Sequence, residues 1–304
     1  MQKLVSIVIP VFNDQKNLRA CLESIYDCDE QNFDVIVVDD CSSQDIKMIV
    51  NEFPCQYIRL PFNKGQAYAR NCGVKSISSE IILFTDSDCR VMKNWVKRLS
   101  DELVQARRVN NIVTVCGQVQ SAEGFIEMSH TYTGYAYVQK GKRRFIEALN
   151  TSCTAIFRED FWKVGGFSED MRVSGEDQDL ALKLVENNRM IVFEPSIWVT
   201  HNHGVHTFKD MVLKHTKWGS TLGLSLMKKH PQKNRILLPL LSKPAVHFFL
   251  IIPLAIATTL KIVLYNFKSD KRICVYSPII LINKIFYRWG IFIKSIEPLS
   301  QRVH

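Results

Sequence analysis

The sequence predicts an α/β fold in which a parallel sheet is covered by helices on both faces. Three observations support this prediction. Over the first 115 residues, short apolar runs rich in Val and Ile alternate with stretches of helical spacing. The apolar runs are continuous, which is typical of strands that are buried on both faces. Acidic residues follow several of these runs, at the positions where sheets of this kind bind their ligands.

Each apolar run and each helical stretch is expected to form one element. The runs expected to form strands are 4–9, 34–38, 56–60, 81–85, 112–116, 154–158 and 197–200. The stretches expected to form helices are 17–26, 45–53, 66–76, 95–107 and 177–187. Lys3 precedes the first run, as in a signal peptide, but no small-residue cleavage site follows. A buried first strand is therefore expected.

Cysteine spacing and glycine spacing exclude two classes of protein. The nine cysteines are scattered without a C-x-x-C pair, which indicates reduced thiols in a cytosolic compartment and no zinc site. A dinucleotide-dependent dehydrogenase would also alternate strands and helices. No G-x-G-x-x-G follows the first apolar run, however, so the pyrophosphate cradle of such an enzyme is missing.

The basic character of the chain belongs to its C-terminal third. Residues 1–200 carry 23 Lys and Arg against 27 Asp and Glu, a net charge of −4. Residues 201–304 carry 16 against 3, a net charge of +13. A uniformly basic nucleic-acid-binding protein would not show this division, so no nucleic acid is expected as a partner.

The C-terminal segment, residues 236–304, is expected to associate with a membrane. Pro244–Leu260 has no formal charge, and as a helix it would be about 26 Å long, close to a hydrocarbon core of about 30 Å. Ile273–Ile293 contains Lys284 and Arg288 on one helical face, which is typical of an interfacial helix. The alternative is a buried helical pair of a soluble domain. The charge of +13 favours the membrane, because Lys and Arg gather at anionic cytoplasmic surfaces.

Acidic clusters follow predicted strands or begin a predicted helix: Asp39-Asp40, Asp86-Ser87-Asp88, and Glu176-Asp177 with Asp179 close behind. Crowded carboxylates are costly unless a cation or a donor group neutralises them. The D-x-D spacing lets Asp86 and Asp88 converge on one Mg²⁺ or Mn²⁺ ion, which can bridge to phosphate oxygens. A solvated turn often has the same spacing and is the alternative for this motif taken alone.

Several motifs occur together, in one order along the chain: S-I-V-I-P-V-F-N, V-V-D-D-C-S, N-K-G-Q-A-Y-A-R-N-C-G, F-T-D-S-D, G-G-F-S-E-D and G-E-D-Q-D-L. In this order, the chain resembles the family 2 glycosyltransferases over about residues 4–205. The resemblance implies the GT-A fold, a Rossmann-like mixed sheet flanked by helices. It also implies transfer of a sugar from a nucleotide-diphosphate donor with inversion, usually with a divalent metal. Residues 1–115 would bind the nucleotide sugar and residues 116–235 the acceptor.

The resemblance assigns the recognition of the nucleotide base to the first two strand ends. Asp39 matches the carboxylate that hydrogen-bonds the base, most often uracil, whose N3–H a carboxylate can accept. Pro10 and Phe12 match the loop that lines the base. The alternative for Asp39 is a turn-forming residue that caps the next helix, a role more natural for Asp40.

The segment from Gly65 to Asn71 matches the part of the family that approaches the nucleotide. Gly65 would permit close contact between the backbone and the ligand. Asn71 is expected either to contact the ligand or to lie on the surface of its helix.

The metal and catalytic residues are also assigned by resemblance. Asp88 would bind Mn²⁺ or Mg²⁺, and Asp86 would support the ion or the ribose. His203 is expected as a further ligand, in preference to His201 and His206, although a lone His is more often structural.

Asp177 matches the catalytic base, and Glu176 would position the acceptor or support the loop. Both could instead be first-turn acids that stabilise their helix. The helix dipole is expected to keep Asp177 ionised.

The predicted protein is a glycosyltransferase at the cytoplasmic face of a membrane, attached peripherally, monotopically or by one or two embedded helices. Its acceptor would be a polyprenyl-diphosphate-linked saccharide or a surface polysaccharide. A polyprenyl-phosphate sugar synthase and an inactive membrane scaffold are the alternatives, and the intact acidic motifs speak against the second. A basic run would meet a phosphate-bearing acceptor or form a solvated face: Lys140, Lys142, Arg143 and Arg144.

Overall fold

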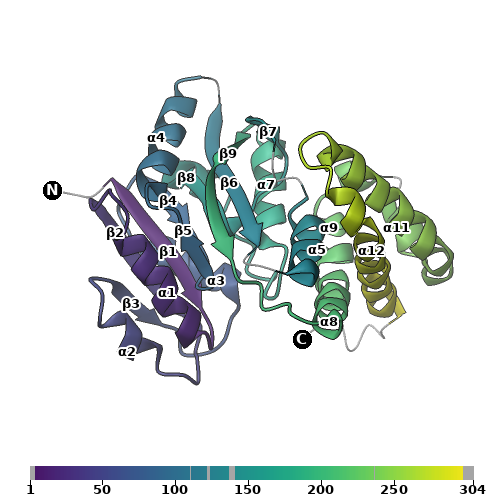
Figure 1. The fold of residues 1–304 in the computed structure, drawn as a ribbon, viewed down its shortest axis with the longest axis horizontal. Helices are drawn as coiled ribbons and strands as arrows, with labels where there is room; N and C mark the ends of the chain where they lie inside the picture. Colours follow the sequence, from purple (N-terminus) through teal and green to yellow (C-terminus); the bar gives the residue numbers. More distant parts are fainter. Residues whose placement is uncertain (1–3, 110, 122–123, 137–140, 236, 297–304) are drawn as a thin grey trace. The chain divides into compact units, whose positions relative to one another are not determined.

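The computed structural model describes residues 4–109, 111–121, 124–136, 141–235 and 237–296, and in these ranges it shows a nine-stranded sheet flanked by helices (Figure 1). The strands are β1 Val5–Val11, β2 Phe33–Asp39, β3 Gln56–Arg59, β4 Ile81–Phe84, β5 Cys89–Val91, β6 Ile112–Ser121, β7 Arg144–Ile146, β8 Thr154–Phe157 and β9 Met190–His201. The longer helices are α1 Gln15–Tyr26, α3 Gln66–Lys75, α4 Trp95–Arg107, α5 Phe125–Gly134, α7 Glu176–Glu186, α8 Phe208–Trp218, α11 Pro244–Phe267 and α12 Ile273–Ile296. The shorter ones are α2 Ile46–Val50, α6 Arg158–Lys163, α9 Leu224–Lys229 and α10 Leu237–Leu241.

The prediction of an α/β fold is confirmed, and so is the mixed sheet that the resemblance implies. The wholly parallel sheet expected from the apolar runs alone is wrong. The strand order is β3-β2-β1-β4-β8-β6-β9-β5, with β7 on β9. The four strands from β3 to β4 are parallel, as are β6 and β9, whereas β8 is antiparallel to both of its neighbours. A continuous apolar run shows that a strand is buried on both faces, and this holds for either direction. The direction of β8 was therefore not contained in the pattern.

The described residues form two compact units. The sheet unit contains residues 1–122, 137–172 and 176–203, within the described ranges. The helical unit contains residues 123–136, 173–175 and 204–304, with the same restriction. These two units are defined by how compactly the chain folds. Their limits differ from the boundaries at residues 116 and 236 that the sequence analysis predicts for the functional segments. The division of the chain into donor, acceptor and membrane segments stays a prediction.

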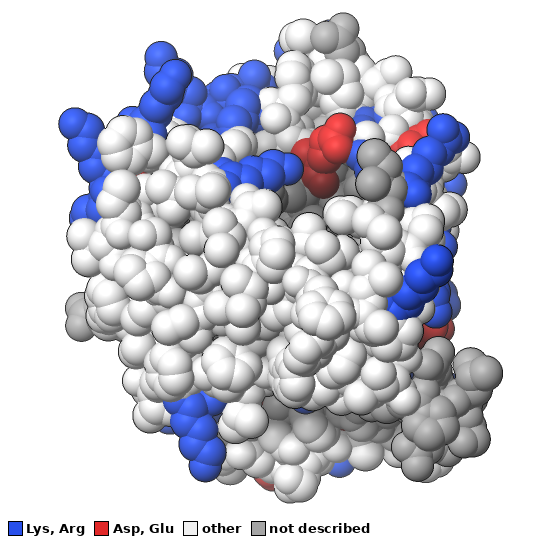
Figure 2. All heavy atoms as spheres, turned by 90° about the vertical axis from the view of Figure 1, so that its right-hand side faces the viewer, with Lys and Arg blue, Asp and Glu red and all other residues white. Residues whose placement is uncertain are grey.

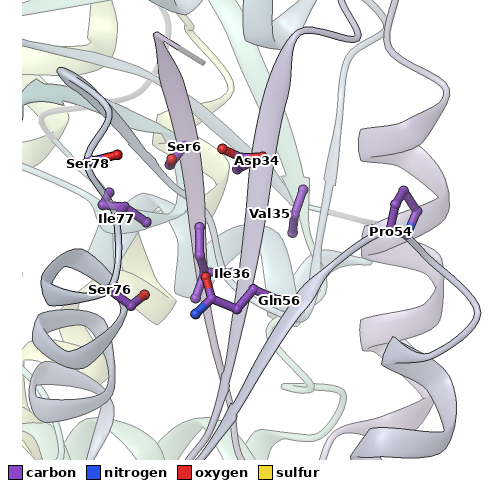
Figure 3. Close-up of a pocket in the computed structure, with 9 residues that line it drawn as sticks. All are labelled: Ser6, Asp34, Val35, Ile36, Pro54, Gln56, Ser76, Ile77 and Ser78. Carbon is purple, nitrogen blue, oxygen red and sulfur yellow. The ribbon is translucent and has the colours of Figure 1, made fainter. Parts of the chain in front are cut away.

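The sheet unit is built as its apolar pattern requires. Strands β1 and β4 are buried along their whole length, and the amphipathic helix α1 buries Leu18, Leu22 and Ile25. At the amino ends of β1, β2 and β3 lies a polar cavity of about 160 Å³ (Figure 3), whose lining includes Ser6 and Asp34. Since β1 and β2 are parallel, this cavity and Asp39 lie at opposite edges of the sheet.

The helical unit contains a helix that the sequence pattern did not predict. In α5 the buried residues are mostly polar, among them Ser129, His130 and Thr133, so the helix has no apolar stripe. Thr133 accepts a hydrogen bond from Asn283 of α12, and the His130 and His215 ring nitrogens lie 3.1 Å apart. These contacts satisfy polar groups inside the unit, as burial of polar side chains requires.

One described helix, α11, is long and apolar enough to cross a membrane. It buries a stripe that includes His247, Ile251 and Ala255, while Phe249 and Leu264 on other faces are 77% and 73% exposed. Only 22% of its most apolar window is buried in the protein. A large apolar surface of this kind marks an interaction site for a membrane or another protein.

Candidate active site

The candidate site lies at the carboxyl edge of the parallel strands. Val11, the last residue of β1, is paired with Asp39, the last residue of β2, and β4 runs parallel beside β1. The chain segments that leave these strands therefore begin at one edge. Phe12 is 49% exposed there, and Asp86 follows the end of β4 by two residues. The sequence pattern had predicted this juxtaposition.

A buried arginine joins two of the acidic clusters. Arg70 lies on α3, and its side chain is 2% exposed. Its Nη2 donates to Asp86 Oδ1 over 2.5 Å, and its Nη1 donates to Glu176 Oε1 over 2.7 Å. Gln66, one turn earlier, also donates to Glu176 Oε1. The loop after β4 and the beginning of α7 are thus held by one cation, which supplies the neutralisation that crowded carboxylates require.

Four side chains could hold a divalent metal at the D-x-D loop. The potential ligand atoms of Asp86, Asp88, Cys89 and His201 all lie within 4.8 Å of one another. His201 Nε2 lies 2.9 Å from Asp88 Oδ1, and Ser152 donates to Asp86 Oδ2. Carboxylate oxygens with one imidazole are suitable ligands for Mn²⁺ or Mg²⁺, so this donor set fits the metal that the resemblance implies.

The ionisation of the group favours a hard cation. Burial would raise the pKa of Asp86, but the charges of Arg70 and His201, with the Ser152 hydroxyl, hold that pKa below its ordinary value. Burial, with the charges of Asp88 and Asp86, raises the pKa of Cys89 well above its ordinary value. Without a metal the thiol therefore stays protonated, and a protonated thiol is a poor ligand, whereas the carboxylate oxygens and the imidazole nitrogen suit a hard cation.

Among the predicted metal ligands, His203 is not part of this group. Its ring lies 3.9 Å from that of His201, centroid to centroid, and it is buried, whereas His206 is exposed. His201 is the last residue of β9, opposite Cys89 of β5. The structure thus places His201, which the sequence ranked second, at the D-x-D loop, and a ligand role for His203 stays a prediction.

Asp177 lies at the beginning of α7, half-buried, next to the buried Glu176. Burial and the neighbouring charge of Glu176 raise the pKa of Asp177 to about 7. Close to pH 7 this carboxylate is then only partly ionised, although the helix dipole alone would favour the ionised form. A pKa near 7 is nevertheless suited to a general base at neutral pH.

Asp39 is fully buried and already holds three protein donors. Its Oδ1 accepts from the Ser42 N–H, and its Oδ2 accepts from Tyr57 Oη and Arg59 Nη1. An ionised carboxylate has about four acceptor positions, so one is not used by the protein. Asp40, expected to cap the next helix, instead accepts from the backbone N–H groups of Lys64 and Gly65.

The cap of α2 comes from Asp45, which accepts from the Met48 N–H. Asp40 instead fixes the turn that leads into α3.

Gly65 and Asn71 have structural roles within the sheet unit. Gly65 has φ = 87°, and a Cβ there would lie 2.3 Å from the Arg172 carbonyl oxygen, so the close approach is to the protein's own backbone. Asn71 is buried, which excludes the helix-surface role. Its side chain donates to the Phe167 carbonyl oxygen and accepts from the Phe167 N–H. Direct contact of either residue with a ligand stays a prediction.

The basic run is part of the sheet unit as far as it is described. Arg143 pairs with Glu102 and Glu194, and the Arg144 guanidinium lies over the Phe193 ring. Lys142 is exposed, and Lys140 lies outside the described residues. Arg143 is therefore engaged in a surface charge network.

The comparison with known protein families decides the identity of the chain. The model of the family described as glycosyl transferase family 2 matches residues 6–165, more than half of the chain. This chain belongs to glycosyltransferase family 2. The prediction of the family, of the enzyme class and of the GT-A fold is thereby confirmed.

Relatives of this glycosyltransferase are found in distant bacteria. An uncharacterized glycosyltransferase of Haemophilus influenzae is 30% identical over 60% of this chain and 62% of its own length. A pre-mycofactocin glycosyltransferase of Mycobacterium tuberculosis is 26% identical over 75% of this chain and 48% of its own length. The chain thus spans between about half and three-fifths of these two relatives.

Two solved structures share the fold of this glycosyltransferase. The S. aureus TarS fragment 1–349 in complex with UDP is 22% identical, with a TM-score of 0.51 over 71% of this chain and 64% of its own. GalNAc-T7 with UDP, GalNAc and Mn²⁺ is 15% identical, with a TM-score of 0.52 over 66% of this chain and 44% of its own.

Arg70 and Ser152 were not among the predicted site residues. Arg70 stands within the N-K-G-Q-A-Y-A-R-N-C-G motif, among the buried residues Ala67, Ala69 and Val74 of α3. Arg70 could have been predicted as a site residue, because a cation among the apolar residues of a helix needs an anionic partner and three acidic clusters in the chain had no assigned cation. No comparable signal marks Ser152.

Proposed function

We propose that this glycosyltransferase transfers a hexosyl group from a UDP-sugar, with inversion, to a lipid-linked saccharide or a growing surface polysaccharide. The proposal includes attachment at the cytoplasmic face of a membrane. The observation that carries it is the pair of ion pairs that Arg70 makes with Asp86 and Glu176. These ion pairs hold the D-x-D loop beside the start of α7. An inactive scaffold would have no need of a buried, neutralised carboxylate cluster, which is costly to keep.

Donor recognition would rest on Asp39, Pro10 and Phe12. The one acceptor position left on the Asp39 carboxylate can take the N3–H of uracil, and cytosine offers no such hydrogen. Phe12 presents an exposed ring beside it on the chain segment that leaves β1. UDP is bound in both of the solved structures that share the fold, which supports this choice of nucleotide.

Transfer would use Asp177 as the base. Asp177 takes the proton of the acceptor hydroxyl while its oxygen forms a bond to the anomeric carbon. The bond from that carbon to the donor phosphate oxygen breaks, and the nucleoside diphosphate leaves from the opposite side, which inverts the configuration. Glu176 Oε2 has no hydrogen-bond partner among the described residues and is the atom proposed to orient the acceptor.

Asp88, Asp86 and His201 would hold Mn²⁺ or Mg²⁺. When bound, such an ion neutralises the negative charge that develops on the departing diphosphate. The proposed ligands are fixed by the protein: Arg70 and Ser152 orient Asp86, and His201 orients Asp88.

Removal of the metal should abolish activity, and Mn²⁺ should restore it. We further expect Mn²⁺ with UDP to raise the melting temperature of the wild type. Asp88→Asn and His201→Gln should lose most of this rise, because each removes a ligand. His203→Gln is the matched control, a buried imidazole two residues away, and should keep the rise. Loss with His203→Gln but not with His201→Gln would return the ligand role to His203. Full activity in excess chelator would exclude the metal.

The acceptor is tested by supplying labelled UDP-sugars with defined acceptors in vesicles. A thermal-shift screen first selects the donor, since a ligand at 100 times its Kd stabilises by about 2.7 kcal/mol. We expect transfer to a polyprenyl-diphosphate-linked saccharide, with inverted anomeric configuration in the NMR spectrum of the product. Transfer to polyprenyl phosphate alone would instead establish the synthase alternative. Binding without transfer or donor hydrolysis in every arm would leave the scaffold alternative.

A further inference from the structure

Two cations lie within the apolar helix α12 of the helical unit. Lys284 and Arg288 are four residues apart, so they share one helical face. Both are half-buried, which places two like charges side by side in partly desolvated positions. Like charges at this spacing destabilise a helix unless an anion neutralises them.

No carboxylate neutralises this pair among the described residues. Lys284 Nζ donates to the Thr133 carbonyl oxygen and lies 5.7 Å from the Tyr287 ring centroid. The Arg288 guanidinium makes no hydrogen bond and no ion pair in the part of the chain that the structure describes. Two histidines are close enough for the charges of the pair to act on them: burial and the charge of Lys284 lower the pKa of His215, and burial and the charge of Arg288 lower the pKa of His247. The surroundings are basic and uncharged groups, so the missing partner is an anion.

The surface beside Arg288 is aromatic and apolar. Trp289, next in sequence, is 39% exposed and lies 5.3 Å from the Phe292 ring, which in turn contacts Phe248 of α11. Phe249 beside it is among the most exposed apolar side chains of the helical unit. Figure 2, which looks onto the side of α11 and α12, shows a broad face without charged side chains; Lys and Arg, with some Asp and Glu, lie at its margin. Exposed aromatic rings next to cations are typical of the membrane–water interface.

We propose that Lys284 and Arg288 form a binding site for the phosphate group of a membrane lipid. The phosphate would accept from the planar fork of Arg288 and from Lys284, while the acyl or prenyl chains lie along the exposed apolar face of α11. The inference deepens the proposed membrane attachment and rests on it. The inference assigns Lys284 and Arg288 to lipid binding and not to the stability of the helical unit. Lipid binding by this pair can be measured without donor binding or turnover.

The test is sedimentation of the full-length protein with vesicles, without donor or acceptor sugar. Three compositions are compared: phosphatidylcholine alone, phosphatidylcholine with an equal part of phosphatidylglycerol, and phosphatidylcholine with a small part of undecaprenyl phosphate. Phosphatidylcholine carries a phosphate whose charge its choline group balances, whereas phosphatidylglycerol and undecaprenyl phosphate carry net negative charge at their phosphate groups. We expect the wild type to prefer one or both of the anionic vesicles. Lys284→Gln with Arg288→Gln should lower that preference about tenfold or more, since each cation near an anionic surface contributes about 1 kcal/mol. If the double variant loses the preference for phosphatidylglycerol vesicles, the site binds the headgroup of an ordinary anionic lipid. If it loses the preference for undecaprenyl phosphate vesicles, the site binds an acceptor-type lipid.

Two further variants distinguish a specific binding site from non-specific electrostatic attraction to an anionic surface. Lys93→Gln with Lys97→Gln removes the same charge from exposed surface pairs of the sheet unit and should change the preference less than about twofold. Arg288→Lys keeps the charge but removes the fork, and should lower the preference at least about threefold. The proposal is overturned if Arg288→Lys behaves as the wild type, if both double variants lose the vesicle preference equally, or if neither anionic vesicle is preferred. Since no turnover is measured, a failed transfer assay leaves this result unaffected.

Discussion

Asp177→Asn is expected to lower turnover at least about 100-fold while donor affinity stays nearly unchanged. The substitution removes the basicity that general-base catalysis requires, and such catalysis is typically worth about 10²- to 10⁴-fold. It preserves the shape and the contact in which Asp177 Oδ1 accepts the Gln178 N–H. The donor would be held elsewhere, by Asp39 and the D-x-D loop. Steady-state kinetics with a UDP titration measures both quantities.

The pH dependence should carry the signature of the same carboxylate. Because the pKa of Asp177 is raised to about 7, the wild-type turnover should fall about tenfold per pH unit below 7 and level off above it. The residual activity of Asp177→Asn should lack this limb. A variant that keeps the limb would show that another group is responsible.

The raised pKa also fixes the sign of a stability effect. A carboxyl whose folded pKa exceeds its unfolded value favours folding at low pH and loses that contribution as pH rises towards 7. Asp177→Asn should therefore be more stable than the wild type at pH 8, by on the order of 1 kcal/mol, and should show no gain at pH 4. Urea unfolding at the two pH values measures this difference.

Glu176→Gln is the comparison for activity. Normal turnover in Asp177→Asn together with no turnover in Glu176→Gln would exchange the roles of the two residues.

The sequence predicted seven of the nine strands in the described part of the chain, most of them because burial on both faces leaves a continuous apolar run. It missed the three-residue strands β5 and β7, and the part of β9 before Ile197. Helix α4 was expected at residues 95–107 and has these bounds, since its apolar positions repeat at helical spacing. The direction of β8 and the helix α5 were not predictable in this way. Direction leaves no trace in a doubly buried strand, and α5 buries polar groups whose partners, such as Asn283, are distant in the sequence.

In the candidate site, too, features set by local sequence were predictable, whereas features set by residues distant in sequence were not. Acidic residues at strand ends were predictable because parallel strands bring their carboxyl ends to one edge. The choice between His201 and His203 was not, since residues two apart point to the same side of an extended chain. The pKa of Asp177 depends on burial and on the charge of the neighbouring Glu176, which the helix-dipole argument did not contain. Arg70 was missed because its two partners lie 16 and 106 residues away.

Arg70→Met is expected to destabilise the sheet unit and to abolish transfer. The substitution keeps an unbranched side chain in the same position but leaves Asp86 and Glu176 without their common cation. Removing one partner of a buried ion pair typically costs about 3–5 kcal/mol, because a desolvated charge remains. Arg70→Lys should cost less, yet one ammonium group cannot make the two separate bonds of the fork, so turnover should still fall at least about tenfold. Urea unfolding and turnover per folded molecule measure the two effects.

A partial rescue separates the charge from its catalytic consequence. Adding Glu176→Gln to Arg70→Met removes one of the two uncompensated charges, so part of the lost stability should return, with a coupling of about 0.5–3 kcal/mol. Turnover should not return, because the D-x-D loop and the start of α7 would still lack the group that joins them. Arg107→Met is the matched control, since Arg107 also pairs with two acids, Glu159 and the buried Asp160, at a place remote from the site. It should cost stability and keep turnover per folded molecule. If Arg107→Met lost turnover as Arg70→Met does, the effect would be general destabilisation, and Arg70 would have no particular role in placing the D-x-D loop beside the start of α7.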